Sequence, residues 1–147
     1  MRITIADYGV GNIHSISKAL ELAGGKVEIV DDMSALADSE CLVLPGVGAF
    51  DAVMKNLLPV RDAVLERLDS GLPALTVCIG SHVLFEGSDE GSLEGIGFYK
   101  GRVRLLGSRT VPHMGWNLVE TGDGIMEGIG ARDFYFAHSY YCDCEPG

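Results

Sequence analysis

The sequence has few positively charged residues and no long run of apolar residues. Its 147 residues hold 11 Lys and Arg against 21 Asp and Glu, a formal net charge of -10. This acidic balance opposes contact with a phosphate backbone, so we expect no nucleic-acid partner. No apolar stretch approaches the roughly 18 residues of a membrane span, and the N-terminus lacks a secretory signal pattern. We therefore expect a cytoplasmic protein with no membrane association.

Cysteines are also scarce and are not spaced for pairing. Cys41 and Cys78 lie far apart, whereas Cys142 and Cys144 form a single CxC near the end of the chain. This arrangement matches neither a disulfide framework nor the CxxC spacing of zinc sites. We expect reduced thiols, no metal ion and no other cofactor.

Strand-like and helix-like segments alternate four times in the first part of the chain. This alternation predicts an α/β fold with a mainly parallel open sheet and helices on both faces. Length and an apolar fraction of 47% favour one domain over residues 1–147. The expected strands are 2–8, 26–30, 41–46 and 73–77, and the expected helices are 13–23, 33–38, 51–70 and 79–87. Pro59 should divide the 51–70 segment into a short helix and a longer one. Appended antiparallel strands are expected at 103–106, 116–120 and 133–141.

The segment TVCIGSH, residues 76–82, has the pattern of a nucleophile elbow around Cys78. Such a strained strand-to-helix turn needs small residues on both sides. Gly80 meets this need, whereas Thr76 is β-branched where glycine is usual. A helix N-terminus after the turn would favour the thiolate. The alternative is that Cys78 is a small buried structural residue.

The segment PGVGAF follows the third expected strand. Gly46 and Gly48 let the backbone around Val47 turn its N–H groups inward, where they could form an oxyanion hole with the amide of Ile79. The alternative is an ordinary tight turn. Together with Cys78, this loop predicts acyl transfer through a thioester.

Three further features have less specific patterns. Gly9 and Gly11 begin a GxGxxG motif, but His14 takes the third glycine position, which favours a loop for ligand or partner contact over dinucleotide binding. His82 lies one helical turn after the elbow and could face the same pocket, although it would align poorly as a general base. Glu90 belongs to an acidic cluster and could hold an α-amino group.

Five segments occur in the order found in class I glutamine amidotransferases: DYGVGNIHSISKAL, LPGVGAFDAVMKNL, VCIGSHVLFEGSDEG, VPHMGWN and FYFAHSYY. The chain resembles this family over essentially its whole length. The resemblance implies a flavodoxin-like fold and a glutaminase subunit that hydrolyses glutamine through a Cys thioester. It also implies a heterodimer in which ammonia passes to a (β/α)8-barrel cyclase partner of histidine biosynthesis.

The resemblance also implies roles for individual residues. Cys78 is similar in position to the nucleophile, and Gly46, Val47 and Gly48 are similar to the oxyanion strand. The chain departs from the family at Thr76 and at His82, which replace Gly and Gln. The implied substrate-binding residues are His82, Glu90, Ser139 and Tyr140, and the implied partner-binding residues are Asn12, Met114 and Trp116.

One family motif does not occur in these residues. Class I amidotransferases continue through a His-Pro-Glu motif whose His is the general base, and no such motif is present in this sequence. We therefore expect a C-terminally incomplete fold and an inactive 147-residue chain, because deacylation needs an aligned base. The alternative is a non-catalytic binding subunit that retains the partner-facing surface.

Overall fold

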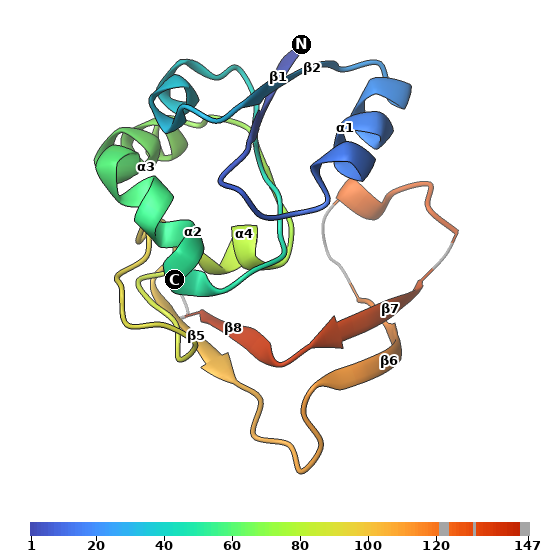
Figure 1. Ribbon diagram of the computed structural model, residues 1–147. Helices are drawn as coiled ribbons and strands as arrows, with labels where there is room; N and C mark the ends of the chain where they lie inside the picture. Colours follow the sequence, from blue (N-terminus) through green and yellow to red (C-terminus); the bar gives the residue numbers. More distant parts are fainter. Residues whose placement is uncertain (121–123, 131, 145–147) are drawn as a thin grey trace. The chain divides into compact units, whose positions relative to one another are not determined.

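A computed structural model describes residues 1–120, 124–130 and 132–144 of the protein (Figure 1). The chain divides into two compact units, one containing Met1–Arg104 and the strand residues from Cys142, the other Leu105–Tyr141. The elements of the first unit are β1 (Arg2–Ala6), α1 (Ile13–Leu22), β2 (Lys26–Val30), the 3-10 helix η1 (Met33–Asp38), β3 (Leu42–Leu44), α2 (Phe50–Leu57), η2 (Leu58–Val60), α3 (Arg61–Asp69), β4 (Ala74–Thr76), α4 (Ile79–His82) and β5 (Gly101–Leu105). The second unit holds β6 (His113–Leu118), η3 (Gly124–Met126) and β7 (Asp133–His138), and β8 (Tyr140–Cys144) runs from it back to pair with β5.

The first unit is built on a four-stranded parallel sheet with the order β2-β1-β3-β4. The middle strand β3 is apolar throughout, and Leu42, Val43 and Leu44 are all fully buried. A strand that is buried on both faces reads as a continuous apolar run, which explains why the alternating pattern of an exposed sheet is absent here. The predicted parallel α/β architecture is confirmed.

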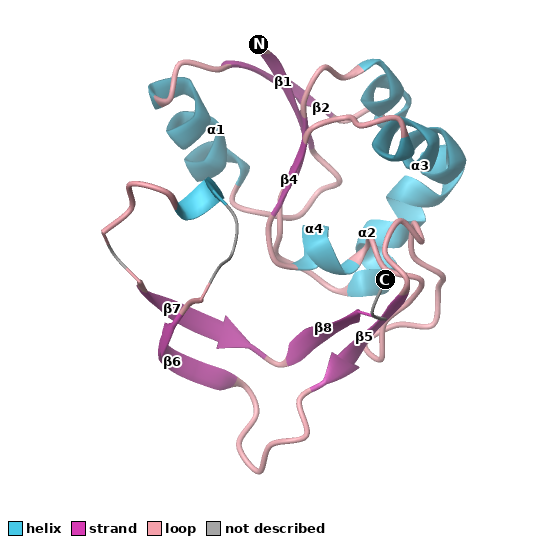
Figure 2. Cartoon of the chain, turned by 180° about the vertical axis from the view of Figure 1, so that it is seen from behind, coloured by secondary structure: helices cyan, strands magenta, loops and turns pink. Residues whose placement is uncertain are grey.

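The two faces of this sheet are covered by different helices. Along β1, Ile3 and Ile5 pack in a cluster with α1, whereas Ala6 belongs to the larger core formed with α2, α3 and η1. Neighbouring side chains of a strand point to opposite faces, so β1 contributes side chains to both clusters. Figure 2, like Figure 1, shows α1 on one side of the sheet and α2 and α3 on the other.

The edge strand β4 is much less covered than β3. Leu75 in β4 is 41% exposed, and Val77, directly after the strand, is 40% exposed. Leu75 lies beside Val43 in the parallel register, so the two side chains share one face of the sheet. Helix α1 packs on this face in the same cluster as Val43. Within the residues that the structure describes, no further strand pairs with β4.

Most predicted elements are present, although several strand ends are shifted by a few residues and two elements differ more. The helix expected over 79–87 ends at His82, because the following backbone turns to other partners: Ile96 donates to the carbonyl of Val83 (2.7 Å) and Tyr99 donates to that of Leu84 (3.0 Å). The strand expected over 133–141 is divided at Ser139 into β7 and β8. The predicted division of the 51–70 helix at Pro59 is confirmed by η2.

The second unit contains an antiparallel ribbon of β6 and β7. Trp116 lies opposite Tyr135, and their rings meet edge to face with centroids 5.6 Å apart. Trp116 is 70% exposed and Met114, on the same face of β6, is 62% exposed. This face of the ribbon therefore presents large apolar side chains to solvent. Across the described ranges, no helix is both long and apolar enough to cross a membrane.

Candidate active site

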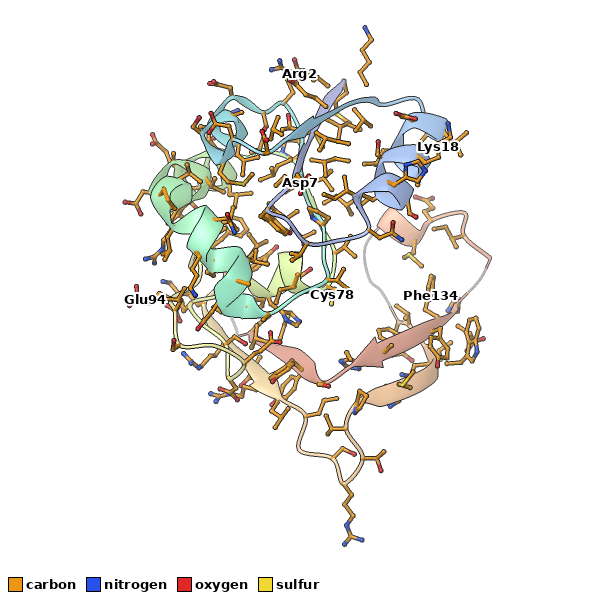
Figure 3. The ribbon with its side chains drawn as sticks, in the orientation of Figure 1. Arg2, Asp7, Lys18, Cys78, Glu94 and Phe134 are labelled. Atoms are coloured by element: carbon orange, nitrogen blue, oxygen red, sulfur yellow. The ribbon has the colours of Figure 1, made fainter. Side chains whose placement is uncertain are left out.

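Cys78 lies in the turn between β4 and α4 (Figure 3). It has φ 51° and ψ -114°, and among the described residues it is the one non-glycine residue with a positive φ. Two backbone hydrogen bonds close the turn, from Gly80 N–H to the Val77 carbonyl (2.9 Å) and from Ser81 N–H to the Cys78 carbonyl (2.8 Å). The thiol is exposed, so the alternative of a buried structural cysteine is excluded.

Two glycines allow the backbone to pack closely at this turn. A Cβ atom at Gly80 would overlap the carbonyl oxygen of Leu44 in β3. A Cβ atom at Gly46 would overlap the carbonyl oxygen of Val77 and lie 2.9 Å from the amide nitrogen of Ile79. Only glycine permits these approaches, which press the strand-to-helix turn against β3 and the loop that follows it.

The loop Gly46–Gly48, called here the oxyanion loop, therefore lies beside the residue that follows Cys78. Ile79 begins α4, and the first N–H groups of a helix have no acceptor within the helix. Val47 is 55% exposed and Gly48 has φ 137°, a conformation that suits glycine. An oxyanion hole needs backbone donors near the reacting thiol, so the roles of this loop and of Ile79 as such donors stay predictions. Because α4 is only one turn long, its dipole adds little to this effect.

Thr76 does not disrupt the turn, although it is β-branched. Its side-chain oxygen lies 2.9 Å from the hydroxyl of Ser81, on the far side of Cys78. The hydroxyl pair is partly buried and gives Thr76 a polar partner at a position where glycine is usual.

The structure adds Tyr8 to the site, a residue that sequence reasoning missed. Its buried phenol donates a hydrogen bond to the carbonyl of Pro45, directly before the oxyanion loop. Burial raises the pKa of Tyr8, and negative charge on the nearby Cys78 raises it further. The phenol therefore remains neutral and keeps its proton for the hydrogen bond. Its place directly after an apolar strand was the only signal in the sequence.

Glu90 lies beside the start of α2, immediately after the oxyanion loop. Its carboxylate accepts a hydrogen bond from Phe50 N–H at 3.3 Å. The same two segments are also joined through Asp51 of α2, whose carboxylate accepts hydrogen bonds from the amides of Leu93 (3.0 Å) and Ser92 (2.9 Å). These amides lower the pKa of Asp51, that of Leu93 having the largest effect. The structure thus brings exposed Glu90 close to the oxyanion loop, and its substrate-binding role stays a prediction.

Asn12 caps α1 and borders a pocket. Its side-chain oxygen accepts a hydrogen bond from Ser15 N–H at 3.3 Å. The pocket has a volume of about 350 Å³ and lies at the carboxyl ends of β3 and β4, where open parallel sheets bind ligands. It is lined by Asn12, Ser15, Ile16, Pro45, Gly46 and Val77.

The remaining predicted residues belong to other parts of the chain. His82 is half-buried at the end of α4, four residues after Cys78. Ser139 and Tyr140 lie in the second unit, as do Met114 and Trp116, so their roles stay predictions. Within the described residues, no cluster of His, Cys, Asp or Glu is placed to bind a metal ion.

The relatives found by comparison of sequences carry the same protein name. No protein-family model matches the chain. The chain is 43% identical to imidazole glycerol phosphate synthase subunit HisH of Halobacterium salinarum, over 95% of this chain and 68% of that protein. It is 42% identical to the subunit HisH of Thermus thermophilus, over 99% of this chain and 75% of the relative. The corresponding protein of Cyanidioschyzon merolae is 38% identical, over 95% and 73% of the two chains.

Solved structures support the fold. A glutamine amidotransferase crystal structure superposes with a TM-score of 0.70 at 16% identity, covering 93% of this chain and 70% of the other. A GMP synthase component from Thermoplasma acidophilum gives a TM-score of 0.60 at 20% identity, over 97% and 66% of the two chains. At these identities the likeness concerns the fold, and it confirms the flavodoxin-like class I amidotransferase architecture.

Proposed function

Because the chain belongs to the family of imidazole glycerol phosphate synthase subunit HisH, within the class I glutamine amidotransferases, we propose that it is a glutaminase subunit with Cys78 as the nucleophile. The observation that carries this proposal is the exposed thiol on a left-handed turn that two close-packed glycines press against the oxyanion loop. A strained conformation of this kind persists where function requires it.

The reaction begins when the Cys78 thiolate attacks the carboxamide carbon of glutamine. The carbonyl π electrons move to oxygen, and the resulting oxyanion accepts hydrogen bonds from amides of the oxyanion loop and of Ile79. The C–N bond then breaks, the nitrogen takes a proton, and ammonia departs. A thioester remains on Cys78. Water attacks the thioester carbon, releases the thiol and yields glutamate.

Substrate binding is assigned to the residues that match the family's motifs. Glu90 holds the α-amino group of glutamine, which its carboxylate charge and its place beside the oxyanion loop support. His82 takes part in binding at the position of the usual glutamine. Ser139 and Tyr140 are assigned to glutamine binding by their match to the family segment FYFAHSYY, and the whole of residues 1–147 is assigned to one amidotransferase domain.

The partner is a (β/α)8-barrel cyclase that receives the ammonia to make imidazole glycerol phosphate in the cytoplasm. Asn12, Met114 and Trp116 contact it. The exposure of Met114 and Trp116 supports this role, because large apolar side chains on a surface are typical of interfaces. The relatives carry the name of a synthase subunit, which fits assembly with a second chain.

The resemblance assigns the general base to a His-x-Glu motif, and no such motif occurs in these 147 residues. The relatives are longer, since the chain spans 68% to 75% of the lengths of those from Halobacterium, Thermus and Cyanidioschyzon. Without an aligned base, leaving-group protonation and deacylation are slow. We therefore expect the 147-residue chain alone to turn over glutamine poorly.

The test combines the barrel cyclase with this chain extended by a C-terminal segment that carries the His-x-Glu motif of class I amidotransferases. Glutamate release is measured for the parent, for Cys78→Ala and for Cys144→Ala, a second exposed cysteine that serves as the matched control. We expect release to fall by a factor on the order of 1000 or more in Cys78→Ala and to persist in Cys144→Ala. Equal release by Cys78→Ala would refute the nucleophile.

The non-catalytic alternative is tested on the 147-residue chain itself. A glutamine-like electrophile should label Cys78 stoichiometrically, and free glutamine should protect it, if the site binds substrate. No labelling, together with retained binding to the cyclase, would instead support a binding subunit.

A further inference from the structure

We propose that Thr76 and Ser81 are positioning residues, whose hydroxyls clasp the nucleophile turn and hold Cys78 in its reactive conformation. The inference rests on the proposed function of Cys78. The two hydroxyl oxygens lie 2.9 Å apart and are partly buried, and either can donate the hydrogen bond. They flank the nucleophile, Thr76 two residues before it and Ser81 three residues after it.

The conformation of Cys78 requires such support. With φ 51° and ψ -114°, the residue occupies a region that L side chains rarely adopt. A non-glycine residue persists there only when its surroundings hold it in place. The backbone bonds that follow Cys78 are local, because Ser81 and His82 both donate to the Cys78 carbonyl, and the bond from Val77 N–H to the Leu44 carbonyl fixes the turn to β3 only before Cys78.

The hydroxyl pair spans the whole turn. Thr76 is held in β4, paired with Leu44 in the parallel register. Ser81 lies in α4, the one-turn helix that begins directly after Cys78. Because one end of the bond is fixed in the sheet and the other in the helix, the bond transmits the position of the sheet to α4. The direction of the thiol depends on both ends.

The bond also explains how a threonine is compatible with the turn. The threonine side chain carries a hydroxyl oxygen, and burying this oxygen without a hydrogen-bond partner costs free energy. Ser81 supplies that partner. Each hydroxyl therefore needs the other, and removing either one removes the same bond.

The experiment measures alkylation of Cys78 by iodoacetamide at pH 7 in the 147-residue chain. Mass spectrometry of the peptide that contains Cys78 separates it from the other exposed thiols, Cys142 and Cys144. The variants are Thr76→Val, Ser81→Ala, the double variant and Thr76→Ser, which keeps the hydroxyl. Ser34→Ala is the matched control, since it removes a hydroxyl bonded to Asp32 at 2.7 Å, outside the site.

We expect Thr76→Val and Ser81→Ala each to slow alkylation of Cys78 by about three- to tenfold, the range that follows from one hydrogen bond. The double variant should be no slower than the single ones, because the same bond is lost, and Thr76→Ser should restore the parent rate. Alkylation of Cys142 and Cys144 in the same samples should not change. A merely structural role would lower the unfolding midpoint and leave the Cys78 rate unchanged.

Any of three results would overturn this inference. They are parent-like alkylation in both single variants, multiplicative slowing in the double variant, and failure of Thr76→Ser to restore the rate. Ser81→Ala keeps the test decisive if Thr76→Val does not fold. The outcome is separate from the proposed function, because alkylation needs neither glutamine nor a general base. If alkylation is parent-like in the variants while glutamate release still depends on Cys78, this inference is overturned and the proposed function is not.

Discussion

Replacing Gly46 by alanine places a methyl group into backbone that has no room for it. The new Cβ would overlap the Val77 carbonyl oxygen and lie 2.8 Å from its carbon and 2.9 Å from the amide nitrogen of Ile79. Carbon contacts are favourable at about 3.5–4.0 Å, so the oxyanion loop and the nucleophile turn must move apart by more than about 1 Å. The atoms in contact are backbone, and no side-chain rotation relieves them.

The cost should lie at or above the upper end of the usual range for overpacking. That range is about 1–3 kcal/mol, and we expect Gly46→Ala to lower the free energy of unfolding by about 3 kcal/mol or more. With a urea dependence of about 1–3 kcal/mol per M, the unfolding midpoint should fall by roughly 1–3 M. The separation of the loop from Ile79 should also slow labelling of Cys78 by a glutamine-like electrophile.

Gly107→Ala is the matched control. A Cβ at Gly107 would have no neighbour within 4 Å, and its φ lies outside the left-handed region. Its unfolding midpoint should therefore stay near that of the parent, with a change within about 1 kcal/mol. If Gly46→Ala matches Gly107→Ala both in urea and in labelling of Cys78, the close approach does not hold the site together.

Two further predictions concern groups around the oxyanion loop. Tyr8→Phe leaves the Pro45 carbonyl without its donor and should lower the free energy of unfolding by about 1–3 kcal/mol in urea, whereas Tyr99→Phe at an exposed position should not. Because the pKa of Asp51 is lowered by folding, its stabilising effect is present above the unfolded pKa of about 4 and is lost as pH falls through the folded value. Asp51→Asn should flatten the decline of the urea midpoint in acid, and an unchanged slope relative to Asp62→Asn would contradict this.

Local pattern was sufficient for most of the parallel core. The strand at Lys26–Val30 and the short helix at Met33–Asp38 have the predicted bounds, because each is set by its own apolar residues and by turn residues beside it. The α4 boundary was wrong for the opposite reason. Val83 and Leu84 are apolar at helical spacing, but their carbonyls accept from distant amides, a choice that local periodicity does not contain.

The site shows the same division. The strand-to-helix turn at Cys78 could be predicted from residue type and spacing, because a glycine two positions after the central residue is typical of a nucleophile elbow. Tyr8 could not, because its role depends on the approach of β1 to the end of β3. Nor could the Thr76–Ser81 bond, which forms only after the turn has folded.

What the order of residues decided, then, is the alternation of strands and helices and the chemical groups placed at the strand ends. Packing decided which of those groups meet. The left-handed turn at Cys78, the overlap that only glycine avoids at positions 46 and 80, and the partner of Thr76 all depend on atoms brought together from separate strands. The physical reason is that hydrogen bonds and close contacts act over a few ångströms in space, whatever the separation along the chain.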